Sequence, residues 1–528
     1  MVKRISLLPS KQSFQVQILA GAHIYNTYKV STRKIKKELQ IEFDLNVPKE
    51  VWAIAGLLGM KGYSSYLVGG CLRDLLMKRA PKDWDIATDA KPEEIQKIFP
   101  DSIYENRFGT VGVKTRSEDP TIAVVEVTTF RKDGKYSDAR HPDKVTFAKT
   151  IEEDLGRRDF TVNALALSLA EGMAAIIDPF GGLQDLKDKV ICAVGEPTKR
   201  FEEDALRLMR AVRFSAQLDF EIEKDTTAAI KNKAELLSRI AEERIRDEFS
   251  KILMTDKAAD GINRLEELGL LKHIIPELRE GIGMGQNKHH IFTVYEHNVK
   301  ALDYAAKKNY SFEVRLSCLL HDVGKSRTKR GNGPDSTFYG HQVIGERMTR
   351  DIMNRLRYSK DMTATVALLV REHMFVYDPE MVTLAGVRRL LARVGAENMA
   401  DLMKLREGDR IGSGVPKAKT YRLRHLEAMV EKVKTDPIGP KMLKVNGNDL
   451  MKELGMLPGP RMGKILAVLL EETLEEPAMN DKEKLLKRAG ELEKLSDKKL
   501  DELGAKAKVS AASAQDRIDE AIKKKYSV

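Results

Sequence analysis

Two carboxylates separated by one residue stand out in the segment Leu67–Thr88, which reads LVGGCLRDLLMKRAPKDWDIAT. Asp83 and Asp85 flank Trp84, and side chains two positions apart on a strand point to the same face. Carboxylates held that close repel each other unless a cation neutralises them, and hard oxygen ligands favour Mg²⁺. Glu126, in the predicted strand VVEVTT, is a candidate third carboxylate. The pattern predicts a magnesium site that activates an attacking oxygen and stabilises a leaving one.

A glycine pair and an arginine precede these carboxylates. Gly69 and Gly70 let the backbone approach a triphosphate closely, with amide hydrogens facing its oxygens. Arg73, one turn into the next predicted helix, is placed for a forked contact to phosphate. An Asp-x-Asp motif by itself most often marks only a turn or a solvated pair. The ordered series of glycine pair, arginine, two aspartates and a later carboxylate-bearing strand is far more specific. It predicts transfer of a nucleotide from a nucleoside triphosphate.

Candidate metal ligands of another kind lie in the second half of the chain: His297, His321, Asp322, His341, His373 and Asp409. Five of these six are predicted to stand on helices. Imidazole with carboxylate suits Mn²⁺, Fe²⁺, Ni²⁺ or Zn²⁺, and Mg²⁺ at lower affinity. A divalent metal held there could activate water for attack on a phosphate ester. The set therefore predicts a second, hydrolytic site.

The elements that must position these residues differ between the two halves of the chain. SYLVGG reads as a strand ending in a glycine turn, CLRDLLM as a helix, and DWDIAT, TVGVKT and IAVVEVTTF as strands. From Phe201 to Leu278 nearly everything reads as helix, with RFEEDALRLMRAVRFSAQL and RIAEERIRDEFSKIL as long amphipathic segments. An α+β head is therefore predicted to precede a mostly α-helical remainder.

Composition limits the class of protein. A chain of 528 residues suggests three or four domains, and a net charge of +11 favours a polyanionic partner such as nucleic acid. Its three cysteines form no C-x-x-C pair, so neither a disulfide framework nor a thiolate zinc site is expected. No apolar run is long enough to cross a bilayer. The expectation is a cytoplasmic protein without a membrane partner.

Five motifs within about residues 46–280 carry a family resemblance: LVGGCLRDLL…PKDWDIAT, VTTFRKDGKYSDARHPDKVTF, EEDLGRRDFTVNALAL, IIDPFGG and RFEEDALRLMRAVRFSAQLDF. They resemble the class II CCA-adding enzyme (tRNA nucleotidyltransferase) and bacterial poly(A) polymerase family. The resemblance implies a polymerase-β-like head that adds nucleotides from CTP and ATP to the 3′ end of tRNA without a nucleic-acid template. It also implies that Asp83 and Asp85 bind Mg²⁺ and that Gly70 and Arg73 contact the incoming nucleotide.

The resemblance assigns roles to two later motifs. In RRDFTVNA, Arg158 would bind the nucleotide and Asp159 would lie near its ribose. The motif EDALRLMRAVR supplies four more candidates for nucleotide contact: Asp204, Arg207, Arg210 and Arg213. In the resembling enzymes the aspartate and first arginine of this motif pair with the edge of the incoming base. The alternative is that arginines three apart on a helix only form ion pairs.

Members of this family differ in which nucleotides they add, and the sequence leaves several of these specificities open. The segment DGKYSDARHPDKVTF resembles the flexible loop of CCA-adding members, although His141 stands where an arginine is common. CCA addition is therefore favoured, and the alternatives are a poly(A) polymerase and an enzyme that adds only CC or only A.

The histidine set resembles the HD phosphohydrolase superfamily, which implies an all-α HD domain with one or two metals. The alternative for this set is a degenerate HD fold kept for tRNA contact or packing. An alternative for the whole protein is an RNA-binding protein whose polymerase site is dead and whose real activity is HD hydrolysis.

The expected organisation follows from these motifs. A basic extension (1–45) precedes the head (46–180), a helical neck and body (181–284), the HD domain (285–415), a helical RNA-binding region (416–480) and a charged tail (481–528). Basic helical surface beyond Ser238 is expected to hold the tRNA acceptor arm by shape and phosphate.

Overall fold

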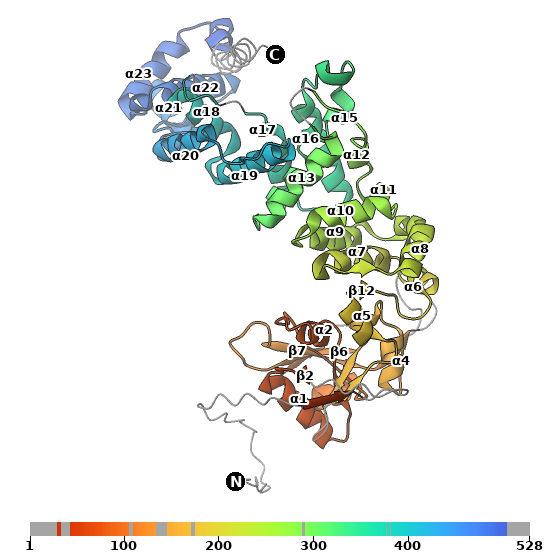
Figure 1. The fold of residues 1–528 in the computed structure, drawn as a ribbon. Coiled ribbons are helices and arrows are strands. Elements are labelled where there is room, and N and C mark those ends of the chain that lie inside the picture. Colours follow the sequence, from red (N-terminus) through yellow and green to blue (C-terminus); the bar gives the residue numbers. More distant parts are fainter. Residues whose placement is uncertain are drawn as a thin grey trace, which may run out of the picture. The chain divides into compact units, whose positions relative to one another are not determined.

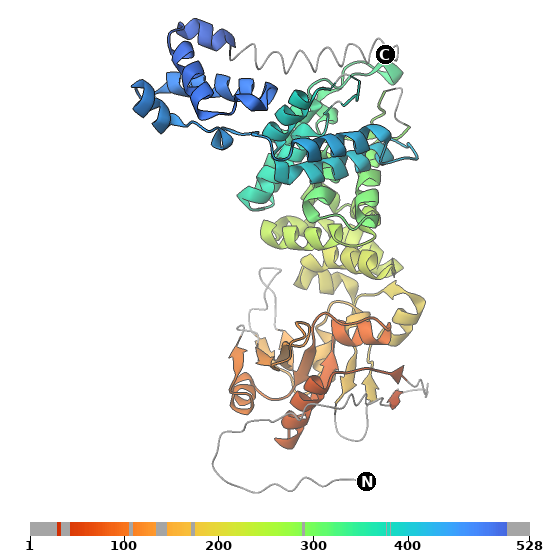
Figure 2. The same ribbon diagram turned by 90° about the vertical axis from the view of Figure 1, so that its left-hand side faces the viewer.

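The computed structural model describes residues 29–32, 43–104, 109–133, 145–169, 175–287, 291–375, 377–380 and 382–503. The chain divides into two compact units, one of residues 1–133 and 145–186 and one of residues 134–144 and 187–528 (Figures 1 and 2). Most of the N-terminal extension, the loop that contains His141 and the end of the charged tail lie outside the described residues. Within the described ranges, no helix combines the length and the apolar character needed to span a bilayer.

One mixed sheet organises the first unit. Its strands run in the order β2 (Phe43–Asp44), β1 (Lys29–Thr32), β11 (Ala175–Ile177), β10 (Ala166–Ser168), β3 (Ser65–Val68), β4 (Asp85–Thr88), β7 (Val124–Thr129), β6 (Thr110–Lys114) and β5 (Ser102–Tyr104). A separate hairpin joins β8 (Arg131–Asp133) to β9 (Val145–Phe147). The helices are α1 (Lys49–Met60), α2 (Gly70–Leu76), α3 (Pro92–Ile98), α4 (Ile151–Gly156) and α5 (Gly182–Asp188), of which α5 extends past the boundary of the unit.

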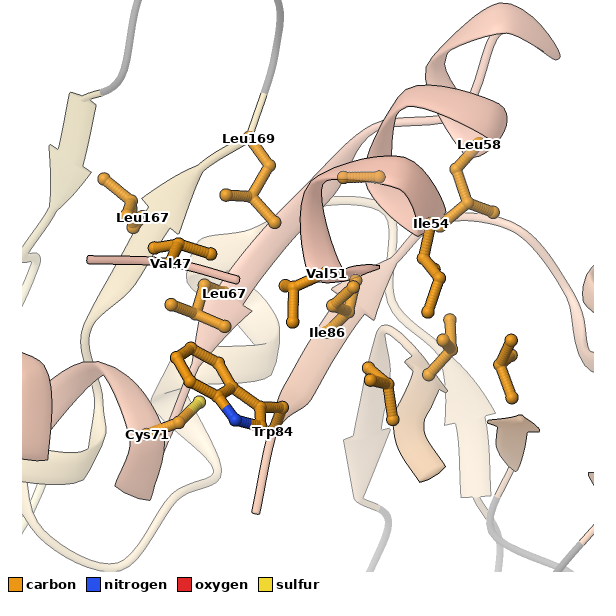
Figure 3. Close-up of a cluster of buried hydrophobic side chains, with 14 of the residues drawn as sticks. Val47, Val51, Ile54, Leu58, Leu67, Cys71, Trp84, Ile86, Leu167 and Leu169 are labelled. Atoms are coloured by element: carbon orange, nitrogen blue, oxygen red, sulfur yellow. The ribbon is translucent and has the colours of Figure 1, made fainter. Parts of the chain in front are cut away.

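The core of this unit forms where α1 packs on the sheet (Figure 3). Val51 and Leu58 of α1 are fully buried together with Leu67 of β3 and Ile86 of β4. The strand β7 alternates buried and exposed residues along its first four positions, as expected for a strand with one face on the core. The strands predicted around Asp85, Val111 and Val127 are thus confirmed.

The described part of the second unit is mainly helical. Its β pairings are a two-residue parallel pairing of β12 (Val190–Ile191) with β13 (Glu221–Ile222) and an isolated bridge between Arg330 and Thr337. Its first helices are α6 (Pro197–Glu203), α7 (Leu206–Leu218), α8 (Lys224–Lys233), α9 (Glu242–Leu253), α10 (Ala258–Glu267), α11 (Leu271–Ile274) and α12 (Pro276–Arg279). The histidine-bearing region contains α13 (Val294–Lys307), α14 (Phe312–Leu320), α15 (Lys325–Thr328), α16 (His341–Arg355), α17 (Lys360–Glu372), α18 (Leu384–Val394) and α19 (Ala396–Gly412). The chain continues through α20 (Tyr421–Val433), α21 (Gly447–Leu454), α22 (Pro460–Glu475) and α23 (Lys482–Glu493).

The prediction of one long helix over RFEEDALRLMRAVRFSAQL is wrong. The helix α6 ends at Glu203, Asp204 is extended (φ −139°, ψ 105°), and α7 begins at Leu206. The Asp204 carboxylate accepts the Leu206 N–H (3.0 Å). Aspartate competes for backbone N–H groups in this way, which is why it favours helix starts over helix interiors.

One buried arginine joins three helices that surround the histidine region. Arg315 of α14 is fully buried, and its guanidinium donates to backbone carbonyls at the ends of α9 and α13. Its acceptors are Tyr310 O (2.9 Å), Leu253 O (2.9 Å), Thr255 O (2.8 Å), Ala306 O (3.4 Å) and Asn309 Oδ1 (3.1 Å). A cation at helix C-termini is favoured by the partial negative charge there. Arg315 therefore fixes α13 and α14, the helices that carry or lead to the first histidines.

We expect Arg315→Met to destabilise the second unit by about 3 kcal/mol or more, because several buried carbonyls would lose their donor. Calorimetric unfolding should show the transition of this unit at a lower Tm. Arg350→Met is the matched control, since Arg350 is only half-buried and, among the described residues, pairs with Glu346 one turn away, and it should change stability by less than about 0.5 kcal/mol. Equal effects of the two substitutions would contradict the role of Arg315.

Candidate functional site

The candidate carboxylates of the first unit meet on adjacent parallel strands. The register of β4 and β7 places Asp85 opposite Glu126, and the Glu126 N–H donates to Trp84 O (2.9 Å). Trp84 is buried in the core, while Asp83 is exposed and Asp85 half-buried. The alternation expected around Trp84 is therefore present, although Asp83 lies just before β4 and not within it.

The electrostatics of this group are dominated by burial and like charge. Burial raises the pKa of Asp85 to about 7, with Glu126 and Asp83 adding to the rise and the Arg158 guanidinium opposing it. Among the described residues, the ligand sets whose atoms all lie within 4.8 Å of one another do not include these three carboxylates. Like charges without a cation between them keep apart. The arrangement is one that a divalent cation would relieve.

A glycine turn lies against both an arginine and a carboxylate. Gly69 ends β3 with φ +74°, a conformation that favours glycine. A Cβ placed on Gly69 would lie 3.0 Å from Nη1 of Arg158 and 3.4 Å from Oδ2 of Asp85. A Cβ on Gly70 would lie 3.7 Å from Nη2 of Arg73. The absence of a side chain at Gly69 thus leaves a space that is bordered by opposite charges.

Arg73 is more deeply placed than the sequence suggests. It is 4% exposed, and its guanidinium donates to Asp74 Oδ1 (2.9 and 2.7 Å) and to Asn163 Oδ1 (2.7 Å). Asn163 in turn donates to Asp159 Oδ1 (3.2 Å), which also accepts the Phe160 N–H (2.8 Å). Asn163, which sequence reasoning missed, therefore links two residues that the sequence predicted separately. The only signal for it is its place in RRDFTVNA.

Asp154, also missed from the sequence, anchors the arginine pair of the same motif. It is 1% exposed and accepts hydrogen bonds from Arg157 (2.8 and 3.0 Å), Arg158 (3.2 Å) and the Arg131 N–H (3.2 Å). Burial acts to raise the pKa of Asp154, but the two guanidinium groups outweigh it and the pKa is lowered. The available signal was an acidic residue three and four positions before two arginines on a helix.

The base-contacting candidates belong to the second unit. Arg244 forms an ion pair with Asp204 (Nη2–Oδ2, 2.9 Å), and Arg207 pairs with Glu203 (2.6 Å). The other two arginines pack against Phe214, with guanidinium-to-ring distances of 5.3 Å for Arg210 and 4.4 Å for Arg213, and Arg213 also pairs with Glu248 (3.1 Å). The ion pairs expected under the alternative interpretation are thus present for Arg207 and Arg213. Contact with a base stays a prediction.

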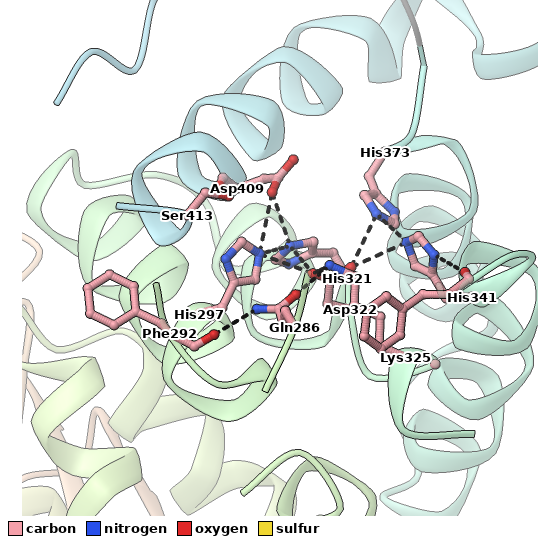
Figure 4. Close-up of polar contacts among 12 residues, drawn as sticks. Gln286, Phe292, His297, His321, Asp322, Lys325, His341, His373, Asp409 and Ser413 are labelled. Atoms are coloured by element: carbon pink, nitrogen blue, oxygen red, sulfur yellow. Dashed lines mark hydrogen bonds and ion pairs between the residues drawn. The ribbon is translucent and has the colours of Figure 1, made fainter. Parts of the chain in front are cut away.

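The six candidate ligands of the histidine region come together in the interior of the second unit (Figure 4). His297, His341 and Asp409 lie within α13, α16 and α19. His321 and His373 directly follow the last residues of α14 and α17, and Asp322 lies in the turn after α14. The prediction that five of the six stand on helices is therefore wrong in part, because α14 and α17 each end one residue before their histidine.

Asp322 is the centre of this cluster. Its Oδ2 lies 3.1 Å from Nε2 of His297 and 3.5 Å from Nε2 of His321. Its Oδ1 lies 3.3 Å from Nε2 of His341 and 3.6 Å from Nε2 of His373. The candidate ligands form two sets, and within each set the ligand atoms all lie within 4.8 Å of one another. The first set is His297, His321 and Asp322, and the second set is Asp322, His341 and His373.

Three of the imidazoles are oriented by backbone carbonyls. Nδ1 of His321, His341 and His373 lies 2.7–2.9 Å from the carbonyl oxygen three residues earlier. Donation of Nδ1–H to a carbonyl leaves the Nε2 lone pair available, which is the orientation that metal-binding histidines have in proteins. The Nε2 atoms accordingly converge, with 2.8 Å between those of His297 and His321 and 3.3 Å between those of His341 and His373.

The charges of the cluster are strongly coupled. Burial acts to raise the pKa of Asp322, but Lys325, whose Nζ lies 2.6 Å from Oδ2, and the surrounding imidazoles lower it well below its usual range. The pKa of Asp409 is lowered in the same way against burial, chiefly by Arg406. For His297 burial is outweighed by the two aspartates, and its pKa rises to about 9, whereas burial lowers that of His373 to about 4. Two buried carboxylates thus face a set of cationic and neutral nitrogen groups.

A pocket of about 460 Å³ opens on one side of the cluster. Asp322, His341, His373 and Asp409 lie in its wall, whereas His297 and His321 do not. A molecule bound in the pocket would therefore contact Asp322, His341 and His373 directly.

Comparison with known proteins identifies the family. A model of the poly(A) polymerase head domain matches residues 65–192, one of the RNA- and SrmB-binding site of polymerase A matches 219–282, and one of tRNA nucleotidyltransferase domain 2 matches 342–489. The CCA-adding enzyme of Geobacillus sp. (strain WCH70) is 33% identical over 431 residues, which cover 81% of this chain and 93% of that protein. That of Limosilactobacillus fermentum (strain NBRC 3956 / LMG 18251) is 34% identical over 433 residues, 82% and 94% of the two chains.

Among solved structures, the Bacillus stearothermophilus CCA-adding enzyme in complex with CTP superposes with a TM-score of 0.64 at 29% identity. The match covers 84% of this chain and 96% of that one. The match extends over nearly the whole length of these relatives, and the chain has the glycine turn, the two aspartates just before and at the start of β4 and Glu126 on the adjacent strand. The chain therefore belongs to the CCA-adding enzyme family, a family of nucleotidyltransferases.

Proposed function

We propose that this protein adds or repairs the 3′-terminal CCA of tRNA from CTP and ATP. The observation that carries the proposal is the parallel register of β4 and β7, which sets Asp85 beside Glu126 and next to the Gly69 turn. In this reaction the 3′-hydroxyl oxygen of the RNA forms a bond to the α-phosphorus of the nucleotide, and its proton passes to water. The bond between the α-phosphorus and the oxygen that bridges to the β-phosphorus breaks, and pyrophosphate leaves. A cytoplasmic location fits this substrate.

The residues of the first unit would share the work on the triphosphate. Asp83 and Asp85 would hold Mg²⁺, which would neutralise charge on the α-phosphate and on the attacking oxygen. The raised pKa of Asp85 and the crowding of like charge fit a cation at this place. The backbone at Gly69 and Gly70 would face phosphate oxygens, and Arg158, held by Asp154, would offer its guanidinium to them.

Selection of the base is assigned to Asp204 and Arg207, with Arg210 and Arg213 nearby on α7. The Arg244 pair orients the Asp204 carboxylate, and the Glu203 pair orients the Arg207 guanidinium. Carboxylate and guanidinium groups held in this way offer acceptors and donors to the edges of cytosine and adenine. tRNA would be held through phosphates by the basic helices that follow.

Nucleotide incorporation on three tRNA transcripts tests the proposal. The transcripts end before CCA, after C and after CC, and each is supplied with CTP, ATP or both. We expect addition that completes CCA and then stops. Unlimited A addition would instead identify a poly(A) polymerase, and addition of only C or only A would identify a specialised enzyme.

We also propose that the histidine cluster is an HD-type phosphohydrolase site. The supporting observation is the convergence of Nε2 atoms on Asp322 while Nδ1 atoms are held by carbonyls. A buried set of imidazoles and carboxylates of this spacing suits a divalent transition metal, or Mg²⁺ at lower affinity. The metal would supply an activated water. The water oxygen bonds to phosphorus, the ester P–O bond breaks, and the leaving oxygen takes up a proton.

Asp83→Ala and Asp85→Asn should each lower CTP incorporation by roughly a thousandfold or more, because the developing charge on the phosphate would lose its counter-ion. Incorporation assays and tRNA gel shifts would measure the two effects, and tRNA binding should stay nearly intact. Asp101→Asn is the control, since Asp101 is exposed in the same unit and makes only long ion pairs with Lys114 (3.6 Å) and Arg116 (3.8 Å). Loss of tRNA binding in the Asp83 variant would count against a catalytic role.

Gly69→Ala should reduce incorporation strongly without unfolding the protein. The added methyl group would meet the Arg158 guanidinium, and alanine is strained at φ +74°. We expect a loss of about 100-fold in kcat/KM for CTP, since displaced charged donors to phosphate are worth about 1.5–3 kcal/mol each. Gly59→Ala is the matched control, because a Cβ there meets nothing within 4 Å. Similar rates for the two variants would exclude a role for the turn.

Asp322→Asn should abolish phosphate release at the histidine cluster while CCA addition continues at the wild-type rate. Asp322 faces both ligand sets, so a neutral amide would weaken both. The assay measures release of inorganic phosphate from nucleoside monophosphates in the presence of Mn²⁺, Ni²⁺, Zn²⁺ or Mg²⁺. Wild-type protein that releases no phosphate with any of these metals would overturn the hydrolytic proposal.

A further inference from the structure

The wall of the pocket beside the histidine cluster carries more positive charge than the binding of a single phosphate group requires. Its wall contains Lys325, Arg406 and Arg410 in addition to the candidate metal ligands. Lys325 pairs with Asp322 (2.6 Å), and Arg406 pairs with Asp409 (Nη1–Oδ2, 2.5 Å). These two cations are therefore matched by the two carboxylates of the cluster, which leaves Arg410.

Arg410 is held without a carboxylate partner. It lies on α19 directly after Asp409, and its hydrogen bond in the described part of the chain runs from Nε to the Lys417 carbonyl (3.4 Å). No carboxylate of the described residues lies within ion-pair distance of it. Arg406, one turn earlier, and Arg422 place positive charge near Arg410, and Asp409 places negative charge near it.

A half-buried guanidinium that has other guanidinium groups nearby is stabilised by an additional anion. The arginine fork is suited to phosphate oxygens, which it can contact through two parallel hydrogen bonds. Because Arg410 and the metal ligands His341 and His373 line the same pocket, one bound molecule can reach both. Such a molecule must carry two separated anionic groups.

The rest of the pocket favours a nucleotide as that molecule. Its volume of about 460 Å³ is in the range of small-molecule sites. Phe338 and Met374 line it, and Tyr339, 70% exposed, presents a ring on which a base can stack.

We propose that this pocket selects nucleotides that carry two phosphate groups, one placed at the histidine cluster for hydrolysis and the other held by Arg410. The inference rests on the proposed hydrolytic activity and names its substrate class. The overall change is that water and the phosphate ester give an alcohol and inorganic phosphate, and the second phosphate stays unchanged. A free nucleoside bisphosphate and an RNA end with a 3′-phosphate, whose neighbouring phosphodiester supplies the second charge, share this chemistry.

The test compares adenosine 3′-phosphate, adenosine 3′,5′-bisphosphate and a short oligoribonucleotide with a 3′-phosphate on the full-length protein. Phosphate release with Mn²⁺ should show kcat/KM about tenfold or more higher for substrates with two phosphates. The ratio between the bisphosphate and the oligonucleotide identifies which source the pocket prefers. Equal kcat/KM for all three would overturn the inference and leave the hydrolytic proposal standing.

Arg410→Gln should reduce the preference for a second phosphate to less than about threefold, and Arg410→Lys should give an intermediate ratio, because lysine keeps the charge without the fork. Arg424→Gln on α20 is the matched control, since Arg424 is exposed and does not line the pocket, and it should keep the wild-type ratio. Thermal unfolding shows whether each variant is folded. A wild-type ratio in folded Arg410→Gln would overturn the role of Arg410.

A second readout does not depend on hydrolysis. Protein treated with EDTA is titrated by calorimetry with adenosine 3′-phosphate and with adenosine 3′,5′-bisphosphate. The bisphosphate should bind about tenfold more tightly, and Arg410→Gln should remove the difference. If no substrate releases phosphate with any metal, the hydrolytic proposal fails; equal affinities in this titration would show that the two-phosphate inference fails as well.

Discussion

The hydrogen-bonded ion pairs of Asp154 are the interaction on which the candidate nucleotide site depends. This carboxylate is almost fully buried, and the cost of burying it is met by two arginines and a backbone N–H. The same bonds hold the Arg158 guanidinium where it borders Gly69 and opposes the carboxylate of Asp85. The turn, the arginine and the aspartate thus form one electrostatic unit, in which the position of each follows from the others.

The two sites solve the problem of gathered carboxylates in different ways. In the first unit Asp83 and Glu126 are exposed and Asp85 is half-buried, so solvent screens part of their repulsion. In the histidine cluster Asp322 and Asp409 are buried, and protein cations neutralise them at short distance. The first arrangement would suit a cation that arrives with a triphosphate. In the second, an ion would be held mainly by the buried imidazoles, because protein cations already balance the two carboxylates.

Much of the candidate site could be predicted from local pattern. Alternation about Trp84 placed Asp83 and Asp85 on one side, and the glycine pair marked a turn that the structure has at positive φ. Asn163 could not be found in that way, because its bond to Arg73 joins residues 90 positions apart. The break at Asp204 also escaped prediction, because the apolar periodicity continues across it and a single side-chain bond to the Leu206 N–H marks the new helix. For the histidines the sequence supplied the ligands, but only the fold supplied the carbonyls that orient them.

The position of Asp322 between the two ligand sets has a consequence for how metals would fill them. One carboxylate oxygen faces His297 and His321 and the other faces His341 and His373, so both sets share the charge of Asp322. Asp409 adds a second charge to the first set, with its Oδ1 3.3 Å from Nε2 of His297 and 3.6 Å from Nε2 of His321. An ion in one set draws on the charge that the other set needs, and the two ions also repel each other. Occupancy of one set by a metal ion would therefore lower the affinity of the other set by an equal factor in both directions, which is negative cooperativity between the two sets.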